Sequence, residues 1–226
     1  MLLLRGSKWM RICAEAHPCL GTIEERMEAA LLHLRSSDPV LAAIIARVGP
    51  YRASTRPATF ETLARSITFQ QLHGKAAAVI FGRLQKAAGR VLTARSFLRL
   101  TEEELRACGL SRQKIASLTD LAERVERREI AFRKLHALSD DDVIELLSRV
   151  RGVGTWTAQM FLMFALERPN VLPLGDLGIR NAVLKAYNLT DLPKPAELSK
   201  IAEKWHPYCT FACWYLWRSL DGQAAL

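Results

Sequence analysis

Apolar residues recur three and four positions apart along most of this chain, which is the spacing of an amphipathic α-helix. Strict alternation of apolar and polar residues, which predicts a strand, appears nowhere convincingly. The helices predicted in this way cover residues 22–35, 39–48, 59–71, 75–88, 101–108, 111–128, 158–166, 176–187, 195–205 and 207–220. A further helix, capped by Ser139, leads into a turn at Arg151. The expected fold class is therefore all-α.

An all-α chain of 226 residues with short loops is expected to form a two-lobed helical bundle with a central cleft. Both ends of the chain could form one lobe and the middle the other. We expect residues 1–21 to be a leader that is frayed or disordered, and residues 22–226 to form the folded part.

The charge balance narrows the range of partners. The formal net charge is +9 and the isoelectric point is near 9.6, which favours nucleic acid or an acidic membrane surface over a neutral partner. A generically basic protein with neither partner is the alternative. No apolar run reaches the roughly 18 residues that span a bilayer. The five cysteines show no metal-binding framework, and Cys209 and Cys213, four residues apart, are expected to belong to the core or to line a pocket.

Two glycines mark the most informative turn. Arg151-Gly152-Val153-Gly154 precedes Thr155 and the apolar run of the next helix. Glycine suits a turn that needs a positive φ or a close approach to another molecule, and a helix N-terminus after such a turn suits a phosphate. An ordinary turn between two helices is the alternative interpretation.

A single acid, Asp176, follows the helix and a proline-containing loop. Its position before an apolar stretch is typical of an N-cap. The same position would also suit a catalytic carboxylate, because the positive end of the helix dipole favours the ionised form. The position alone does not choose between these roles.

Two more segments carry candidate chemistry. Residues 205–217 are rich in aromatic side chains, which predicts either an aromatic core or a pocket in which a flat, electron-poor ligand stacks. Residues 70–75 place polar side chains and Gly74 between two helices. This is either an ordinary turn or a loop tip that enters a nucleic-acid groove.

Taken together, these motifs resemble a known family. The segments VRGVGTWTA with Asp176, SITFQQLHGKAA (66–77), GLSRQKIASLTDLA (109–122) and the tryptophan-rich end resemble the helix-hairpin-helix DNA glycosylases. Within them, the segments resemble the 3-methyladenine DNA glycosylase II branch of base-excision repair. The resemblance covers roughly residues 22–221. It implies a protein that flips alkylated purines out of duplex DNA and hydrolyses their N-glycosidic bond.

The resemblance also implies residue roles. Asp176 matches the catalytic aspartate, and Trp156, Met160 and Trp217 match the walls of the base pocket. The residues matched to DNA contact are Gly152, Val153, Gly154, Thr155, Gln71, Leu72, His73 and Lys75. Trp156 stands where lyase members carry the lysine that forms a Schiff base, which predicts a monofunctional hydrolase. The backbone carbonyls of Ser148, Val150 and Val153 are implied ligands of a monovalent cation, Na+ or K+.

The expected partner is double-stranded DNA containing alkylated bases, bound by a monomer without a membrane and without a required cofactor. The expected location is the bacterial cytoplasm at the nucleoid, or the nucleus of a eukaryote. Arg151, Cys209 and Met160 depart from residues common in the family, which leaves the range of lesions open. A non-catalytic helix-hairpin-helix DNA-binding module and a glycosylase or lyase for another damaged base are the alternatives.

Overall fold

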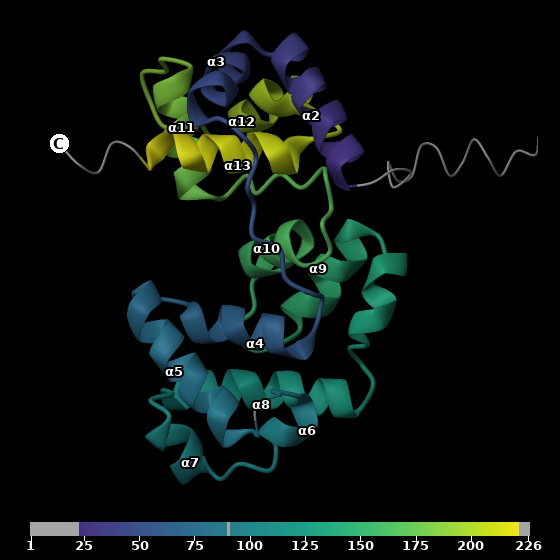
Figure 1. Ribbon diagram of the computed structural model, residues 1–226, viewed down its shortest axis with the longest axis vertical. Coiled ribbons are helices and arrows are strands. Elements are labelled where there is room, and N and C mark those ends of the chain that lie inside the picture. Colours follow the sequence, from purple (N-terminus) through teal and green to yellow (C-terminus); the bar gives the residue numbers. More distant parts are fainter. Residues whose placement is uncertain (1–22, 90, 222–226) are drawn as a thin grey trace, which may run out of the picture. The chain divides into compact units, whose positions relative to one another are not determined.

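The computed structural model describes residues 23–89 and 91–221, and every regular element in these ranges is a helix (Figure 1). The all-α prediction is therefore confirmed. The expected leader, residues 1–21, and Cys13 and Cys19 within it lie outside the described residues. Among the helices described, none is long and apolar enough to cross a membrane. The chain divides into two compact units.

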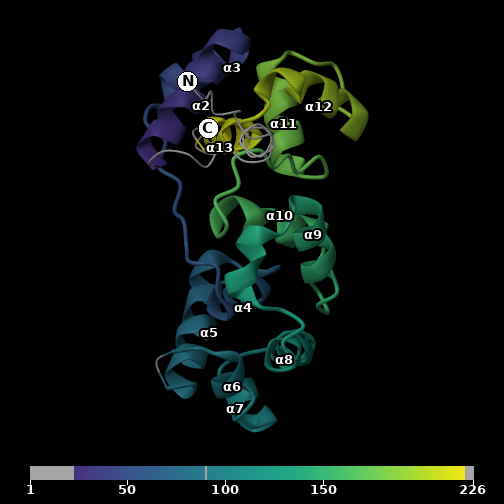
Figure 2. The same ribbon diagram turned by 90° about the vertical axis from the view of Figure 1, so that its right-hand side faces the viewer.

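The first unit joins residues 23–52 to residues 174–221. Its elements are α2 (Ile23–Ser37), α3 (Pro39–Val48), α11 (Leu177–Ala186), α12 (Pro195–Ala202), the short 3-10 helix η2 (Glu203–Trp205) and α13 (Cys209–Leu220). Helix α13 packs on α3 and α11, so the purple helices and the yellow helix lie side by side in both views (Figures 1 and 2). The aromatic segment supplies much of this core, because Trp205 and Tyr215 are fully buried.

A buried carboxylate ties the first unit together. Asp38 caps α3 through the amides of Val40 and Leu41, and its Oδ2 accepts hydrogen bonds from Tyr187 and from the Trp205 indole at 2.8 Å. Burial alone would raise the pKa of the Asp38 carboxyl. These hydrogen bonds, with the Lys204 ammonium 3.3 Å away, outweigh burial and lower that pKa.

The second unit comprises residues 53–173, with residue 90 outside the described part. Its elements are α4 (Phe60–Phe69), α5 (Gly74–Ala87), α6 (Ala94–Phe97), α7 (Glu102–Ala107), α8 (Arg112–Glu126), the 3-10 helix η1 (Phe132–Ala137), α9 (Asp140–Ser148) and α10 (Thr155–Phe164). Helix α8 is central, because α4, α6 and α7 all pack on it (Figure 1). Leu63, Ile67, Leu84 and Leu118 are fully buried there.

Local signals located most helix starts correctly. Ser139 and Asp176 each accept an amide hydrogen bond as N-caps, as predicted, and Asp38 and Ser111 cap their helices in the same way. The periodic pattern missed α6 and η1, which are too short to show a helical period. It also began α10 at Ala158, whereas the helix starts at Thr155 directly after Gly154. It predicted one helix over 195–205, whereas α12 ends at Ala202 and the last three residues form η2.

Candidate functional site

Asp176 is the candidate catalytic acid, and the first unit holds it rigidly. The chain leaves Pro173, and Asp176 becomes the N-cap of α11, with Oδ1 accepting the Ile179 N–H at 2.7 Å. Only 8% of the residue is exposed. The predicted cap is thus observed, and it fixes the carboxylate at the positive end of the helix.

Trp217 reaches the same carboxylate from α13. Its indole Nε1–H donates to Asp176 Oδ1 at 3.0 Å. Gly178 makes this approach possible, because a Cβ there would lie 3.1 Å from Asp176 Oδ1 and 3.1 Å from both Trp217 Cδ1 and Nε1. The sequence predicted Trp217 as a pocket wall and did not predict its bond to Asp176.

The cysteines behind this acid belong to the core, as the sequence predicted. Cys209 and Cys213 on α13 are fully buried. Burial raises the pKa of the Cys209 thiol to about 12, and burial followed by the nearby Cys209 and Asp176 raises that of Cys213. Both groups are therefore neutral thiols at physiological pH. Among the described residues, no three His, Cys, Asp or Glu side chains gather as a metal site.

The glycine hairpin lies in the second unit between α9 and α10. Gly152 takes φ +76°, a conformation that favours glycine, whereas Gly154 is extended and caps α10 without a side chain. The Val153 N–H donates to the Val150 carbonyl at 3.0 Å. Val153 is buried, with 4% of the residue exposed, whereas Gly152, Gly154 and Thr155 are exposed.

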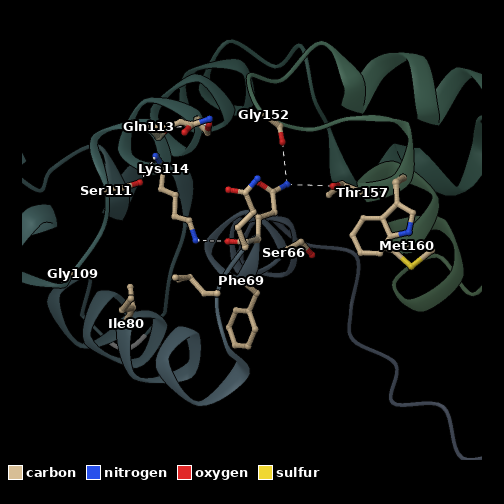
Figure 3. Close-up of a pocket in the computed structure, with 15 residues that line it drawn as sticks. Ser66, Phe69, Ile80, Gly109, Ser111, Gln113, Lys114, Gly152, Thr157 and Met160 are labelled. Carbon is tan, nitrogen blue, oxygen red and sulfur yellow. Dashed lines mark hydrogen bonds between the residues drawn. The ribbon is translucent and has the colours of Figure 1, made fainter. Parts of the chain in front are cut away.

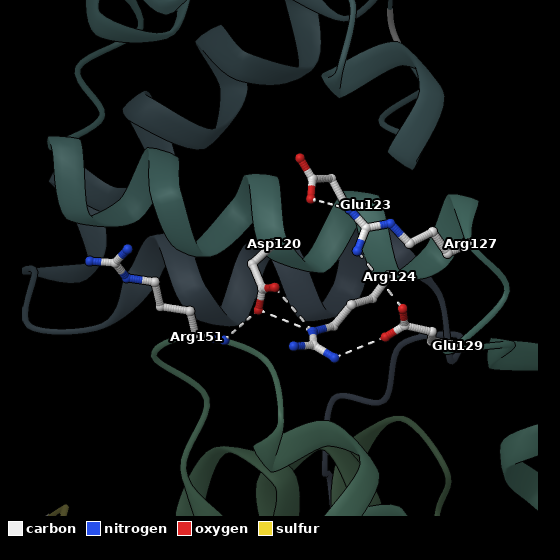
Figure 4. A network of polar contacts seen from close by, with 6 residues as sticks. All are labelled: Asp120, Glu123, Arg124, Arg127, Glu129 and Arg151. Carbon is white, nitrogen blue, oxygen red and sulfur yellow. Dashed lines mark hydrogen bonds and ion pairs between the residues drawn. The ribbon is translucent and has the colours of Figure 1, made fainter.

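Helix α8 supports the hairpin from behind. A Cβ on Gly152 would lie 2.8 Å from Ser117 Oγ, so the turn and the helix are in close contact. Asp120 Oδ2 accepts the Arg151 N–H at 2.7 Å, and Arg124 Nε holds the same carboxylate at 3.1–3.2 Å (Figure 4). The roles of Ser117 and Asp120 are not evident from the sequence, because nothing local links them to a turn more than 30 residues away.

The turn between α4 and α5 is fixed to the hairpin. Gln70 Nε2 donates to the Gly152 carbonyl at 3.0 Å and to Thr157 Oγ1 at 3.3 Å (Figure 3). Lys114 Nζ donates to the Thr68 carbonyl and, at 2.9 Å, to the Gln70 carbonyl. Gln71 follows with φ +54°. The Lys114 ammonium is therefore engaged inside the protein.

This turn, α8, the hairpin and α10 line a cavity of about 800 Å³ in the second unit (Figure 3). Gln71, Leu72, Trp156 and Met160 line it. Trp156 is 51% exposed and Leu72 39%, although both are large apolar side chains. Exposed apolar side chains that line a concave pocket together with a few polar groups are typical of a ligand-binding surface. His73 and Lys75 are exposed at the start of α5 and do not line this cavity.

The fold and these sites together define an all-helical protein with a supported glycine hairpin and a capped, buried acid. The model of the HhH-GPD superfamily of base excision DNA repair proteins matches residues 64–207. The chain belongs to this superfamily.

Similar proteins cover most of the chain. DNA-3-methyladenine glycosylase 1 of Schizosaccharomyces pombe is 34% identical over 209 residues, which are 87% of this chain and 92% of that protein. The structure of a 3-methyladenine DNA glycosylase from the same yeast, in complex with abasic DNA, has a TM-score of 0.76 at 34% identity and covers 85% of this chain and 97% of that one. The structure of a DNA-3-methyladenine glycosidase from Bacillus halodurans has a TM-score of 0.79 at 33% identity, and the match covers 86% of this chain and 90% of that one.

Proposed function

We propose that this protein is a monofunctional DNA glycosylase that hydrolyses the N-glycosidic bond of alkylated purines, such as 3-methyladenine, in duplex DNA. The observation that carries the proposal is the Asp176 carboxylate, held by the Ile179 amide and the Trp217 indole. The family membership and the names of the similar proteins support the substrate class.

The chemistry asks for one fixed negative charge. As the bond between C1′ and the purine nitrogen breaks, its electron pair leaves with the base and the sugar becomes oxocarbenium-like. An ionised Asp176 stabilises that positive charge and orients a water, whose oxygen bonds to C1′ and whose proton passes to the carboxylate or to solvent. An alkylated purine already carries positive charge, so its ring is neutralised on leaving without a general acid.

Trp156 supports the hydrolytic route and the choice of base. Its position in the first turn of α10 and its 51% exposure suit stacking against an electron-poor purine. Tryptophan has no amine, so it cannot form the Schiff base on which strand cleavage by a lyase depends. Met160, one turn further along α10, offers an adaptable apolar contact.

Residues of the second unit would bind the DNA backbone and fill the gap that the flipped base leaves in the duplex. Gly152, Gly154 and Thr155 present backbone at the start of α10, where a phosphate is favoured. Gln71 and the exposed Leu72 stand on a turn that Lys114 and Gln70 make rigid, which suits a wedge entering the duplex.

A monovalent cation would add positive charge beside that phosphate. Such a cation prefers oxygen ligands, and the carbonyls of Ser148, Val150 and Val153 would supply them. The Val150 oxygen already accepts the Val153 N–H but has a second lone pair for the cation. The reaction as proposed requires no other cofactor.

Release of free 3-methyladenine from a methylated duplex tests the proposal. We expect wild-type protein to release the base and Asp176→Asn to lose release while retaining affinity for duplex DNA. Asp191→Asn is the matched control, because Asp191 is an exposed acid in a loop of the same unit. Normal release by Asp176→Asn would refute the assigned role. DNA binding without any release by wild type would favour a non-catalytic module.

Borohydride trapping tests the monofunctional assignment separately. A lyase forms a covalent imine with the opened sugar, and borohydride reduces it to a stable protein–DNA adduct. We expect no adduct with a substrate from which the wild type releases its base. An adduct would identify a lyase.

A further inference from the structure

A second, smaller cavity in the second unit carries concentrated positive charge. Its volume is about 190 Å³, and it lies beside α4 and the C-terminal half of α10. Arg56 and Arg65 line it together with the hydroxyl-bearing Ser54, and Phe161 and Phe164 contribute an apolar wall. Met160, assigned above to the base pocket, also lines this cavity, whereas the two arginines and Ser54 have no role in the base release described above.

Arg65 is held in place by an aromatic ring. Its guanidinium carbon lies 3.6 Å from the centroid of the Phe69 ring, and Phe69 in turn packs edge-on against Phe81 at 6.4 Å. Such stacking occupies one face of the guanidinium. The N–H groups point outward in the guanidinium plane, so stacking leaves this edge available for an anion.

Arg56 adds a second charge from the segment before α4. Its main-chain N–H donates to the Phe164 carbonyl at 2.9 Å, which fixes the backbone at the cavity. Burial, followed by the charge of Arg56, lowers the pKa of Arg65, which indicates that the two guanidinium groups repel each other. Both stay protonated at neutral pH, because an arginine does not lose its proton in a protein.

No carboxylate in the described part of the chain offsets these charges. The ion pairs found in residues 23–89 and 91–221 involve neither Arg56 nor Arg65. Glu61, one turn earlier in α4, is engaged elsewhere, since its carboxylate accepts hydrogen bonds from Gln85 at 2.7 Å and from the Leu92 amide at 3.3 Å. Two like charges facing one cavity without a counter-charge favour a bound anion.

We propose that Arg56 and Arg65 form a phosphate-binding site. The planar guanidinium fork matches the oxygens of a phosphate, and two such groups surround one phosphate from different sides. The cavity volume admits the group, and Ser54 adds a hydroxyl donor. The source is either a DNA backbone phosphate, which rests on the proposed function, or free inorganic phosphate, which does not.

Two substitutions test this site, Arg56→Gln and Arg65→Gln. Both keep polar side chains, and Arg56→Gln leaves the Phe69 stack intact, so a folding defect in one variant does not remove the test. Arg95→Gln is the matched control, because Arg95 is an exposed arginine on α6 in the same unit. Thermal melting confirms that each variant is folded.

Calorimetry with inorganic phosphate against chloride at equal ionic strength measures the site directly. We expect wild type and Arg95→Gln to bind phosphate, and both site variants to bind it at least about tenfold more weakly, as expected for loss of one charge-assisted bidentate pair. Equal phosphate binding by all four proteins would overturn the proposal. So would a wild type that binds no phosphate, if the site variants also bind DNA as the wild type does.

Titration of an unmodified duplex at several salt concentrations then identifies the source. If the site holds a backbone phosphate, the slope of log affinity against log salt becomes shallower by about 0.9 in each site variant. If only inorganic phosphate binding falls, free phosphate is the ligand. Base release by the wild type is measured on the same preparation, so that failure of the two proposals can be distinguished. If the wild type releases no base, the proposed glycosylase activity is refuted, but the result for phosphate binding still stands.

Discussion

Replacing Gly178 with alanine should separate stability from activity. Gly178 is the second residue of α11, and alanine is favoured over glycine inside a helix by about 1 kcal/mol. Helix propensity alone therefore predicts a protein at least as stable as the wild type. The site predicts the opposite for activity, because the new methyl group points at the contact between Asp176 and Trp217.

The magnitude follows from the crowding. The added Cβ would lie 3.1 Å from Asp176 Oδ1 and from two atoms of the Trp217 indole, whereas carbon contacts are comfortable at about 3.5–4.0 Å. Asp176 and Trp217 must each move away from the new carbon by a few tenths of an ångström, which weakens their 3.0 Å hydrogen bond. A hydrogen bond to a charged group contributes about 1.5–3 kcal/mol, so the rate of base release should fall, by about 10- to 150-fold if the bond is lost.

Single-turnover release of 3-methyladenine from a methylated duplex is the assay, with thermal melting alongside it. Gly82→Ala is the control, because Gly82 is an exposed helical glycine whose Cβ would meet nothing within 4 Å. If Gly178→Ala fails to fold, Trp217→Phe removes the same donor and keeps an aromatic ring. A release rate within about twofold of wild type for a folded Gly178→Ala would refute the argument.

Three further outcomes are expected. Gly152→Ala should weaken duplex binding and destabilise the fold by about 1–2 kcal/mol, because φ is +76° and Ser117 is close. Gly154→Ala should fold normally, because a Cβ there would meet nothing within 4 Å. Denaturant titration measures the stability of both variants, and a DNA-binding titration measures their affinity for a duplex. Lys114→Met should speed amide hydrogen exchange in residues 70–73 and cost about 2 kcal/mol, through loss of its bonds to two carbonyls. The melting temperature of Asp38→Asn should fall less steeply than that of the wild type as the pH is lowered. The folded pKa of this carboxyl is lowered, so its stabilisation is present above about pH 4 and is lost as pH falls through the lowered pKa.

Interactions between residues within one helical turn of each other could be predicted from the sequence. Asp176 caps α11 through an amide three residues away, and Ser111 and Ser139 act in the same way, so side-chain type and the following apolar pattern suffice to locate these helix starts. The hairpin glycines follow the same logic, since the need for positive φ at Gly152 is local. Recognition of the family came from four such local motifs in order.

Contacts between helices were not accessible in this way. Trp217 lies 41 residues from Asp176, Gln70 lies 82 residues from Gly152, and the Arg56 backbone is fixed by Phe164 more than a hundred residues away. Each depends on how far one helix is rotated against another, and helical periodicity specifies the buried face but not the partner that covers it. The sequence alone determined where most of the longer helices begin and where an acid and a hairpin occur. Only the tertiary structure decided that an indole, a glutamine and a lysine from distant helices hold them in place.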